Sequence, residues 1–284
     1  MKKAFPNRLL MSTVTPLESS LTIPGAAPST VYNEAFDPTG QPRPAWKPLI
    51  DAAQRIPLGE FVHRSSQADL LVSENGVTFN VFHEGTRAQR PWQLDLLPYI
   101  IDAEQWRTLE AGLKQRASLL NWIVRDCHGE RSLIRSSALP PEVLFANPGY
   151  HRPFVGLHQF GPSIVSAAAE LAKDQYGQWH VMADRTESPA GAAFALENRI
   201  VASRTIPPSM HEQPVHRLAS FFLRTQNTLR LLGNRLAENP RIVLLSPGAK
   251  YPYYFEDVYL ARYLGYSLVE GADLTVQDGR VWLR

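Results

Sequence analysis

The sequence predicts a mixed α/β (α+β) fold, and three patterns lead to that prediction. Apolar residues recur at intervals of three and four positions between residues 103 and 125, as in an amphipathic helix. Residues 241–245 and 266–269 resemble strands on either side of a helix at 255–264, which together make a βαβ unit. Turn signals within residues 163–184 and 273–284 predict two hairpins. No internal repeat is visible.

The remaining elements follow from the same patterns. Helices are expected at 45–55, 192–204 and 212–237, and a strand is expected at 77–82, where apolar and polar residues alternate. The segment from residue 55 to Glu74 is a polar stretch to which no element is assigned. Residues 1–30 are rich in Ser, Thr and Pro without any period, which predicts a flexible N-terminal arm. We therefore expect three regions, 1–30, 31–238 and 239–284.

Composition bounds the function classes. The formal net charge of +2 is too small to indicate a nucleic-acid surface, and no run of apolar residues is long enough to span a membrane. A single cysteine rules out a disulfide within the chain, so we expect a reducing, cytoplasmic setting. Six of the 29 basic residues are lysine. The arginine bias suits carboxylate or phosphate ligands, although a GC-rich genome produces the same bias.

One predicted hairpin carries an unusual set of charges. If residues 174–177 form its loop, Glu170 pairs with Val181 across the strands. The two-residue period of a strand then places Glu170, Ala183 and Arg185 on one face and Asp184 on the other. A glutamate in an alanine-rich strand must be exposed, paired or bound to a cation, because an isolated buried charge is costly.

A turn and a helix follow this hairpin. The segment Ser188-Pro189-Ala190-Gly191 leads into the helix that carries Glu197, Asn198 and Arg199. The Ser188 hydroxyl and the N–H groups near Gly191 could bind an anionic carboxylate or phosphate. Glu197 and Arg199, taken alone, could equally form an ordinary solvated helix face.

Two further motifs carry weaker signals. Ser246-Pro247-Gly248 follows a predicted strand, where α/β sheets present ligands, but it contains no phosphate-loop motif and could be a plain connection. Cys127 and His128 are adjacent and could form the nucleophile pair of a hydrolase. Neighbours on a helix end point in different directions, so that alternative is remote.

Several segments, in order along the chain, resemble the circularly permuted ATP-grasp family (type 2), of the kind related to glutathionylspermidine synthase. These segments are Tyr32-Asn33-Glu34-Ala35-Phe36-Asp37, Leu94-Asp95-Leu96-Leu97-Pro98, Asn147-Pro148-Gly149-Tyr150, Ala183-Asp184-Arg185-Thr186 through Leu196-Glu197-Asn198-Arg199, Leu245-Ser246-Pro247-Gly248, Glu270-Gly271-Ala272-Asp273-Leu274 and Asp278-Gly279-Arg280-Val281. The ordered set is more specific than any one segment.

The resemblance implies an ATP-dependent carboxylate–amine ligase that uses ATP and Mg²⁺. The family's metal hairpin, carried over, falls on Glu170, Ala183 and Arg185, so two positions that supply oxygen ligands in the family hold Ala and Arg here. Glu170 remains as a metal-ligand candidate, but Mg²⁺ demands oxygen ligands and a normal site is not expected. Arg185 could instead pair with Glu170 or contact a phosphate directly.

The same resemblance defines the expected site and its completeness. We expect Arg185 and Asp184 to act in catalysis and the following residues to bind substrate or nucleotide: Glu170, Ser188, Gly191, Glu197, Asn198 and Arg199. The chain corresponds to an incomplete, N-terminal portion of the permuted fold, in which residues 239–284 form a βαβ unit like the pre-ATP-grasp domain. Its partners would be a small-molecule or peptide substrate with a carboxylate and an amine, and a C-terminal companion domain or chain. The alternative is a degenerate, non-catalytic module that binds a peptide or a partner protein.

Overall fold

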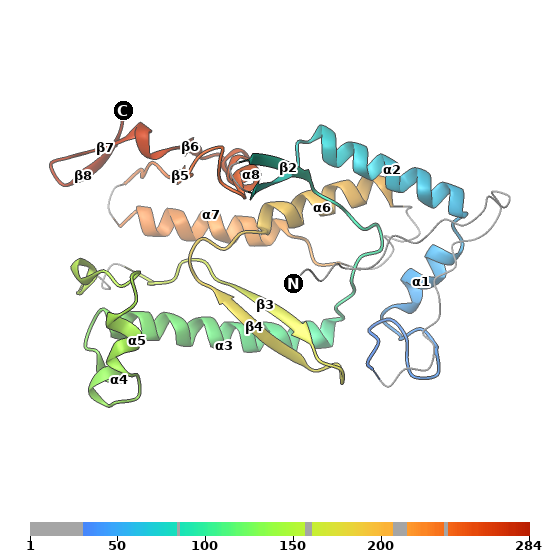
Figure 1. Ribbon diagram of the computed structural model, residues 1–284, viewed down its shortest axis with the longest axis horizontal. Coiled ribbons are helices and arrows are strands. Elements are labelled where there is room, and N and C mark those ends of the chain that lie inside the picture. Colours follow the sequence, from blue (N-terminus) through green and yellow to red (C-terminus); the bar gives the residue numbers. More distant parts are fainter. Residues whose placement is uncertain (1–30, 84–85, 157–160, 207–214, 236–237) are drawn as a thin grey trace.

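The computed structural model describes residues 31–83, 86–156, 161–206, 215–235 and 238–284, and these form helices and small sheets (Figure 1). The helices are α1 (Lys47–Gln54), α2 (Leu58–Glu74), α3 (Ala103–Cys127), α4 (Ser132–Arg135), α5 (Pro141–Phe145), η1 (Arg152–Phe154), α6 (Ala192–Thr205), α7 (Ala219–Gly233), α8 (Tyr254–Leu264) and η4 (Gly271–Asp273). The strands are β1 (Thr78–His83), β2 (Thr86–Pro91), β3 (Ala168–Lys173), β4 (Trp179–Arg185), β5 (Val243–Leu245), β6 (Ser267–Val269), β7 (Leu274–Gln277) and β8 (Arg280–Leu283). The mixed α/β class is as predicted.

Helix α6 lies at the centre of the main hydrophobic core. Its Phe194 and Val201 are buried together with Ala68 and Val72 of α2. The Phe194 ring packs between Trp92, at a centroid distance of 4.6 Å, and Phe255 of α8, at 5.2 Å. Aromatic pairs at these distances add to the free energy gained from apolar burial. Segments from three parts of the sequence therefore hold α6 in place.

A second core cluster lies on another side of α6. Leu196 is buried there with Phe222 of α7 and Leu264 of α8. A helix that buries apolar residues on more than one side is an interior helix. Packing from several directions thereby sets the position of α6.

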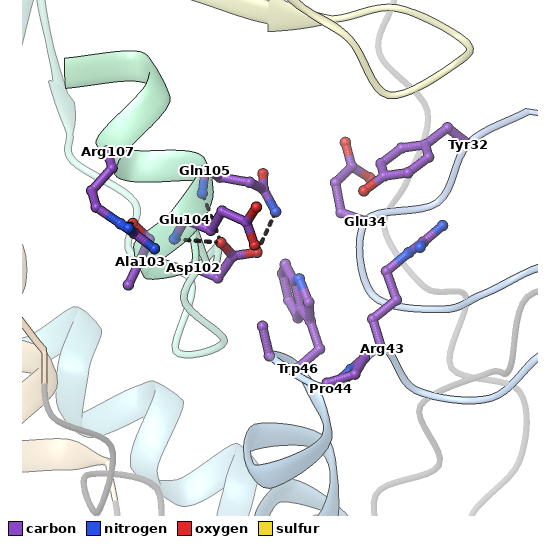
Figure 2. Close-up of a pocket in the computed structure, with 11 residues that line it drawn as sticks. Tyr32, Glu34, Arg43, Pro44, Trp46, Asp102, Ala103, Glu104, Gln105 and Arg107 are labelled. Atoms are coloured by element: carbon purple, nitrogen blue, oxygen red, sulfur yellow. Dashed lines mark hydrogen bonds between the residues drawn. The ribbon is translucent and has the colours of Figure 1, made fainter. Parts of the chain in front are cut away.

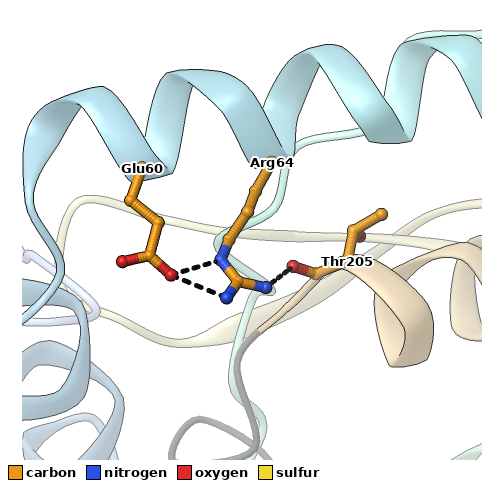
Figure 3. A network of polar contacts seen from close by, with 3 residues as sticks. All are labelled: Glu60, Arg64 and Thr205. Carbon is orange, nitrogen blue, oxygen red and sulfur yellow. Dashed lines mark hydrogen bonds and ion pairs between the residues drawn. The ribbon is translucent and has the colours of Figure 1, made fainter.

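A polar network ties α2 to the end of α6 (Figure 3). The Arg64 Nη2 lies 2.6 Å from Oε1 of Glu60, one turn earlier on α2. Its Nη1 donates to the carbonyl oxygen of Thr205, the last residue of α6, at 2.9 Å. The last carbonyls of a helix have no partner within the helix, so this contact satisfies one of them.

The described strands pair two by two. β5 and β6 are parallel and are joined through α8, so the predicted βαβ unit is confirmed. The predicted C-terminal hairpin is also confirmed, as β7 and β8, with Asp278 and Gly279 at its turn in the left-handed region. The apolar run at 241–245 would also predict that this strand is buried, and that is wrong in part, because Leu245 is 58% exposed.

The β3–β4 hairpin lies along α3 (Figure 1), and several contacts join the two. Trp179 Nε1 donates to the side chain of Gln105 at 3.3 Å. Asn121 Oδ1 accepts hydrogen bonds from the backbone of Ser163 and Ile164, in the segment that leads to β3. Helix α3 thus positions the hairpin through contacts that run from Gln105 in its first turn to Asn121 in a later turn.

Several expectations differ from the structure. The polar stretch from 58 to 74 is helix α2, which buries Ala68 and Val72. Of the helix expected at 212–237, the structure shows α7, and residues 215–218 precede that helix. Residues 212–214 and 236–237 lie outside the described residues. The predicted N-terminal arm, 1–30, also lies outside them. The apolar face of α3 is less buried than predicted, with Trp106 38% exposed. The division at residue 238 stays a prediction.

Candidate functional site

The charged hairpin brings Glu170 and Arg185 together on one face, as its period predicts. Arg185 Nε donates to Glu170 Oε1 at 2.8 Å, and its Nη2 lies 2.7 Å from the same oxygen. The side chains of Arg185 and Glu170 are 60% and 55% exposed. Water screens such a pair, so it contributes little stability and remains accessible to a charged ligand.

The pairing register differs from the prediction. Glu170 lies opposite Ala183 and not Val181, for two reasons: the strands pair from Lys173 and Trp179, so the loop also includes Gln178, and a bulge falls between Glu170 and Leu171. The bulge places the carboxylate beside a residue without any ligand atom, and Arg185 already pairs with one of its oxygens. Among the described residues, no group of three or more His, Cys, Asp or Glu side chains could hold a metal ion. Mg²⁺ does not fit this hairpin face, since it requires several oxygen ligands.

Asp184 lies on the other face of β4 and binds α3. Arg116 Nε and Nη2 each donate to the Asp184 carboxylate at 2.7 Å, which forms a bidentate pair. The hydrogen bond from Arg116 lowers the pKa of Asp184 below its ordinary value of 3.8. Asp184 therefore remains charged at neutral pH and orients the hairpin on α3.

The Arg116–Asp184 pair gives a pH-dependent prediction. A carboxylate whose pKa is lower in the folded state contributes stability above its unfolded pKa and loses it as the pH falls through the folded pKa. Replacing Arg116 with Gln should raise the pKa of Asp184 toward 3.8. Carbon-13 NMR titration of the Asp184 carboxyl group in both forms measures this, and an identical midpoint in the two would contradict the pairing.

The start of α6 differs from the expectation of free N–H groups. The carboxylate of Glu256, from α8, accepts hydrogen bonds from the backbone N–H of Gly191, at 2.6 and 2.8 Å, and of Ala193, at 3.0 Å. Glu256 is 3% exposed, and burial raises its pKa although these backbone hydrogen bonds act in the opposite direction. The protein's own carboxylate occupies the position proposed for an external anion, and exposed Ser188 adopts a positive φ of 44° nearby in sequence.

The residues further along α6 serve packing contacts. Glu197 is 3% exposed and accepts a hydrogen bond from Asn75 Nδ2 at 2.5 Å. Burial and then a hydrogen bond to Glu197 raise the pKa of Tyr259 on α8. Asn198 accepts from Trp92 Nε1 at 2.7 Å, and Arg199 is exposed. Glu197 and Asn198 join α6 to its neighbours, and only Arg199 extends into solvent.

The two weaker motifs have structural roles. Ser246 is buried, donates to Asp257 Oδ2 at 2.6 Å and accepts from the Gly248 N–H, so its loop closes on α8. Cys127 is 5% exposed, and burial raises the pKa of its thiol. A thiol held in its neutral form is a weak nucleophile, which argues against the hydrolase alternative.

A pocket that the sequence did not indicate lies between the first described segment and the start of α3 (Figure 2). It has a volume of about 490 Å³. Its lining residues are Tyr32, Glu34, Arg43, Pro44, Ala45, Trp46, Asp102, Ala103, Glu104, Gln105 and Arg107. The residues come from segments more than fifty positions apart, so spacing along the sequence could not reveal the pocket.

Comparisons with known proteins define the class. The helices and small two-stranded sheets are consistent with an ATP-grasp-like fold, and residues 98–284 match the family model described as circularly permuted ATP-grasp type 2. The chain belongs to the circularly permuted ATP-grasp type 2 family. ATP-grasp proteins as a family bind ATP and Mg²⁺. Within the described part of the chain, no helix combines the length and apolarity that a membrane crossing requires.

The chain resembles uncharacterized proteins over most of its length. It is 35% identical over 266 residues to a protein of Mycobacterium tuberculosis (strain ATCC 25618 / H37Rv), a match that covers 90% of this chain and 30% of the relative. It is 32% identical over 258 residues to a protein of Synechocystis sp. (strain ATCC 27184 / PCC 6803 / Kazusa), covering 90% of this chain and 54% of the relative. The chain therefore spans between about a third and about half of these relatives.

Proposed function

We propose that this chain is part of an ATP-dependent carboxylate–amine ligase that forms peptide bonds. The observation that carries the proposal is the family match over residues 98–284. In such a ligase, a carboxylate oxygen attacks the γ-phosphate of ATP, which releases ADP and leaves an acyl phosphate. The amine then attacks the acyl carbon and displaces phosphate, losing a proton. Residues 239–284, with their parallel βαβ unit, would correspond to the pre-ATP-grasp-like part.

Arg185 is the residue that we propose contacts nucleotide phosphate. Its guanidinium is exposed and pairs with one oxygen of Glu170, and no described residue accepts a hydrogen bond from its Nη1. A guanidinium binds phosphate oxygens with charge-assisted hydrogen bonds. Glu170 would orient Arg185, and Asp184 would hold the hairpin through Arg116. Ser188 and Arg199, both exposed, would extend the same ligand surface.

We further propose that chain outside the matched region completes the site. The relatives from Mycobacterium and Synechocystis carry 70% and 46% of their length outside the match. Such a segment, as a further domain or a companion chain, would supply the metal ligands that the β3–β4 hairpin lacks. Mg²⁺ would then bind at groups other than Ala183 and Arg185.

Phosphate release tests this proposal. The full-length Synechocystis relative, incubated with ATP, Mg²⁺ and mixtures of carboxylates and amines, should release phosphate only when both substrates are present. The 284-residue chain alone should bind ATP but release phosphate far more slowly. Absence of substrate-dependent release by both proteins would contradict the ligase function.

A second candidate is a non-catalytic module that binds a peptide or a partner protein. It is favoured by two contacts within the chain: Glu170, a candidate metal ligand, pairs with Arg185, and the Glu256 carboxylate binds the N–H group of Gly191 that was expected to bind an anion. This candidate predicts no saturable ATP binding by the chain. It also predicts that Arg185→Ala leaves the affinity for that peptide or partner protein unchanged.

A further inference from the structure

We propose that the pocket at the start of α3 binds a small zwitterionic amino compound, such as an amino acid or a dipeptide. In this arrangement, Arg43 pairs with the carboxylate of the ligand, and Glu34 pairs with its ammonium group. The proposal goes beyond the ligase function and does not depend on it, because this binding needs neither ATP nor Mg²⁺.

The size and shape of the pocket fit such a ligand. Its volume of about 490 Å³ lies within the range of small-molecule sites, roughly 300–1,000 Å³. Figure 2 shows Tyr32, Glu34 and Arg43 on one side, the first residues of α3 on the other, and Trp46 between them. The aromatic rings offer apolar contact, while the charged groups around them can fix a ligand's orientation.

Glu34 is the acceptor for the ammonium group. It is half-buried, and it forms no ion pair with any other part of the described chain. Removing a carboxylate from water without pairing it costs free energy. A ligand ammonium would recover that cost with a charge-assisted hydrogen bond, which makes Glu34 selective for a protonated amine.

Arg43 is held ready for a carboxylate. Its Nε donates to the Asn33 carbonyl at 2.9 Å, and its guanidinium carbon lies 4.5 Å from the centre of the Tyr32 ring. These contacts fix the plane of the guanidinium and use only one of its nitrogens in a hydrogen bond. A fixed guanidinium loses little conformational entropy when it binds an anion.

The opposite side adds negative charge without competing for the ligand. Asp102 accepts hydrogen bonds from the backbone N–H groups of Glu104 and Gln105 and from Gln105 Nε2. The backbone hydrogen bond from Gln105 is the main cause that lowers the pKa of Asp102. Asp102 is thus charged and committed to capping α3, and its field favours a cationic group in the pocket.

The first described segment is anchored to the β3–β4 hairpin, so this side of the pocket is preorganised. The Tyr32 N–H donates to the Gln175 carbonyl at 2.8 Å, at the hairpin turn. The Tyr32 ring packs so closely on Gly177 that a Cβ there would lie 2.6 Å from it. On the hairpin, Lys173 Nζ lies 5.0 Å from the ring centre. These contacts attach the pocket to the element that carries Glu170 and Arg185.

Three matched probes test the proposal: L-alanyl-L-alanine, its N-acetyl form without the ammonium, and its C-terminal amide without the carboxylate. Each is titrated into the ¹⁵N-labelled chain, and the Trp46 indole N–H signal, assigned with Trp46→Phe, is followed by NMR. The free dipeptide should shift the signal saturably, and each blocked form should bind at least about tenfold more weakly. Glu34→Gln should weaken the free dipeptide to the affinity of the acetylated form and leave the acetylated form unchanged.

Arg43→Gln should likewise reduce the affinity for the dipeptide to that of its amide. If loss of its contact to Asn33 unfolds the segment, the Glu34→Gln result still decides. Asp51→Asn, which breaks an exposed ion pair with Lys47 on α1, is the control and should leave binding unchanged. An unmoved Trp46 signal, equal affinity for all three probes, or equal affinity for the dipeptide and its amide would overturn the proposal.

Discussion

Replacing Glu256 with Ala should lower the free energy of unfolding by about 3 kcal/mol, because two backbone N–H donors at the start of α6, one of them on buried Ala193, then lose their charged acceptor. Gly191 and Ala193 donate to this carboxylate, which is 3% exposed. Urea unfolding followed by circular dichroism measures the loss.

Two control variants distinguish the loss of the Glu256 hydrogen bonds from a general effect on stability of removing a glutamate. Glu256→Gln keeps an acceptor oxygen and should cost less than Glu256→Ala. Glu130 is 86% exposed, so Glu130→Ala should stay within about 0.5 kcal/mol of the wild type. Equal stability of Glu256→Ala and Glu130→Ala would show that the cap contributes nothing.

Replacing Arg185 with Ala should weaken ATP binding by about 10- to 100-fold, because hydrogen bonds between charged groups contribute about 1.5–3 kcal/mol. The same change leaves Glu170 unpaired beside the bound phosphates, which adds repulsion. Stability should hardly change, since the Arg185–Glu170 pair is exposed on both sides. Displacement of a fluorescent ATP analogue measures the affinity.

Arg135 provides the matched control for Arg185. It is also exposed and pairs with an exposed glutamate, Glu130, at 3.7 Å, but it lies on α4. Arg135→Ala should leave ATP affinity unchanged. A similar loss in both variants would indicate a nonspecific effect of positive charge, and no loss in Arg185→Ala would remove Arg185 from the site.

The sequence predicted those helices and strands whose residue pattern is contained within a single short segment of the chain. The helical spacing from 103 to 125 became α3, and the turn at 174–177 became the β3–β4 hairpin with Arg185 beside Glu170. The parallel βαβ unit followed from apolar runs on either side of a helix. On the missed α2 only Ala68 and Val72 are buried, while the apolar residues Leu58, Val62 and Leu70 are exposed, so its sequence has no clear apolar stripe.

Contacts between distant segments could not be predicted from spacing. Glu256 lies 65 positions along the chain from Gly191 and accepts its N–H hydrogen bond. The predicted binding position for an external anion is therefore occupied by a carboxylate of the protein. Arg116 reaches Asp184 from 68 positions away. The loop that includes Gln178 and the bulge after Glu170 together changed the register, and no residue type at these positions predicts either feature. The pocket around Trp46 likewise required the fold to bring its two sides together.

Calorimetric titration of the 284-residue chain with ATP and Mg²⁺ tests most directly whether it is a nucleotide-binding part of an ATP-grasp ligase. We predict saturable binding that Arg185→Ala weakens and Arg135→Ala preserves. Heats no larger than those of dilution, up to millimolar ATP, would contradict the account and favour the non-catalytic binding module.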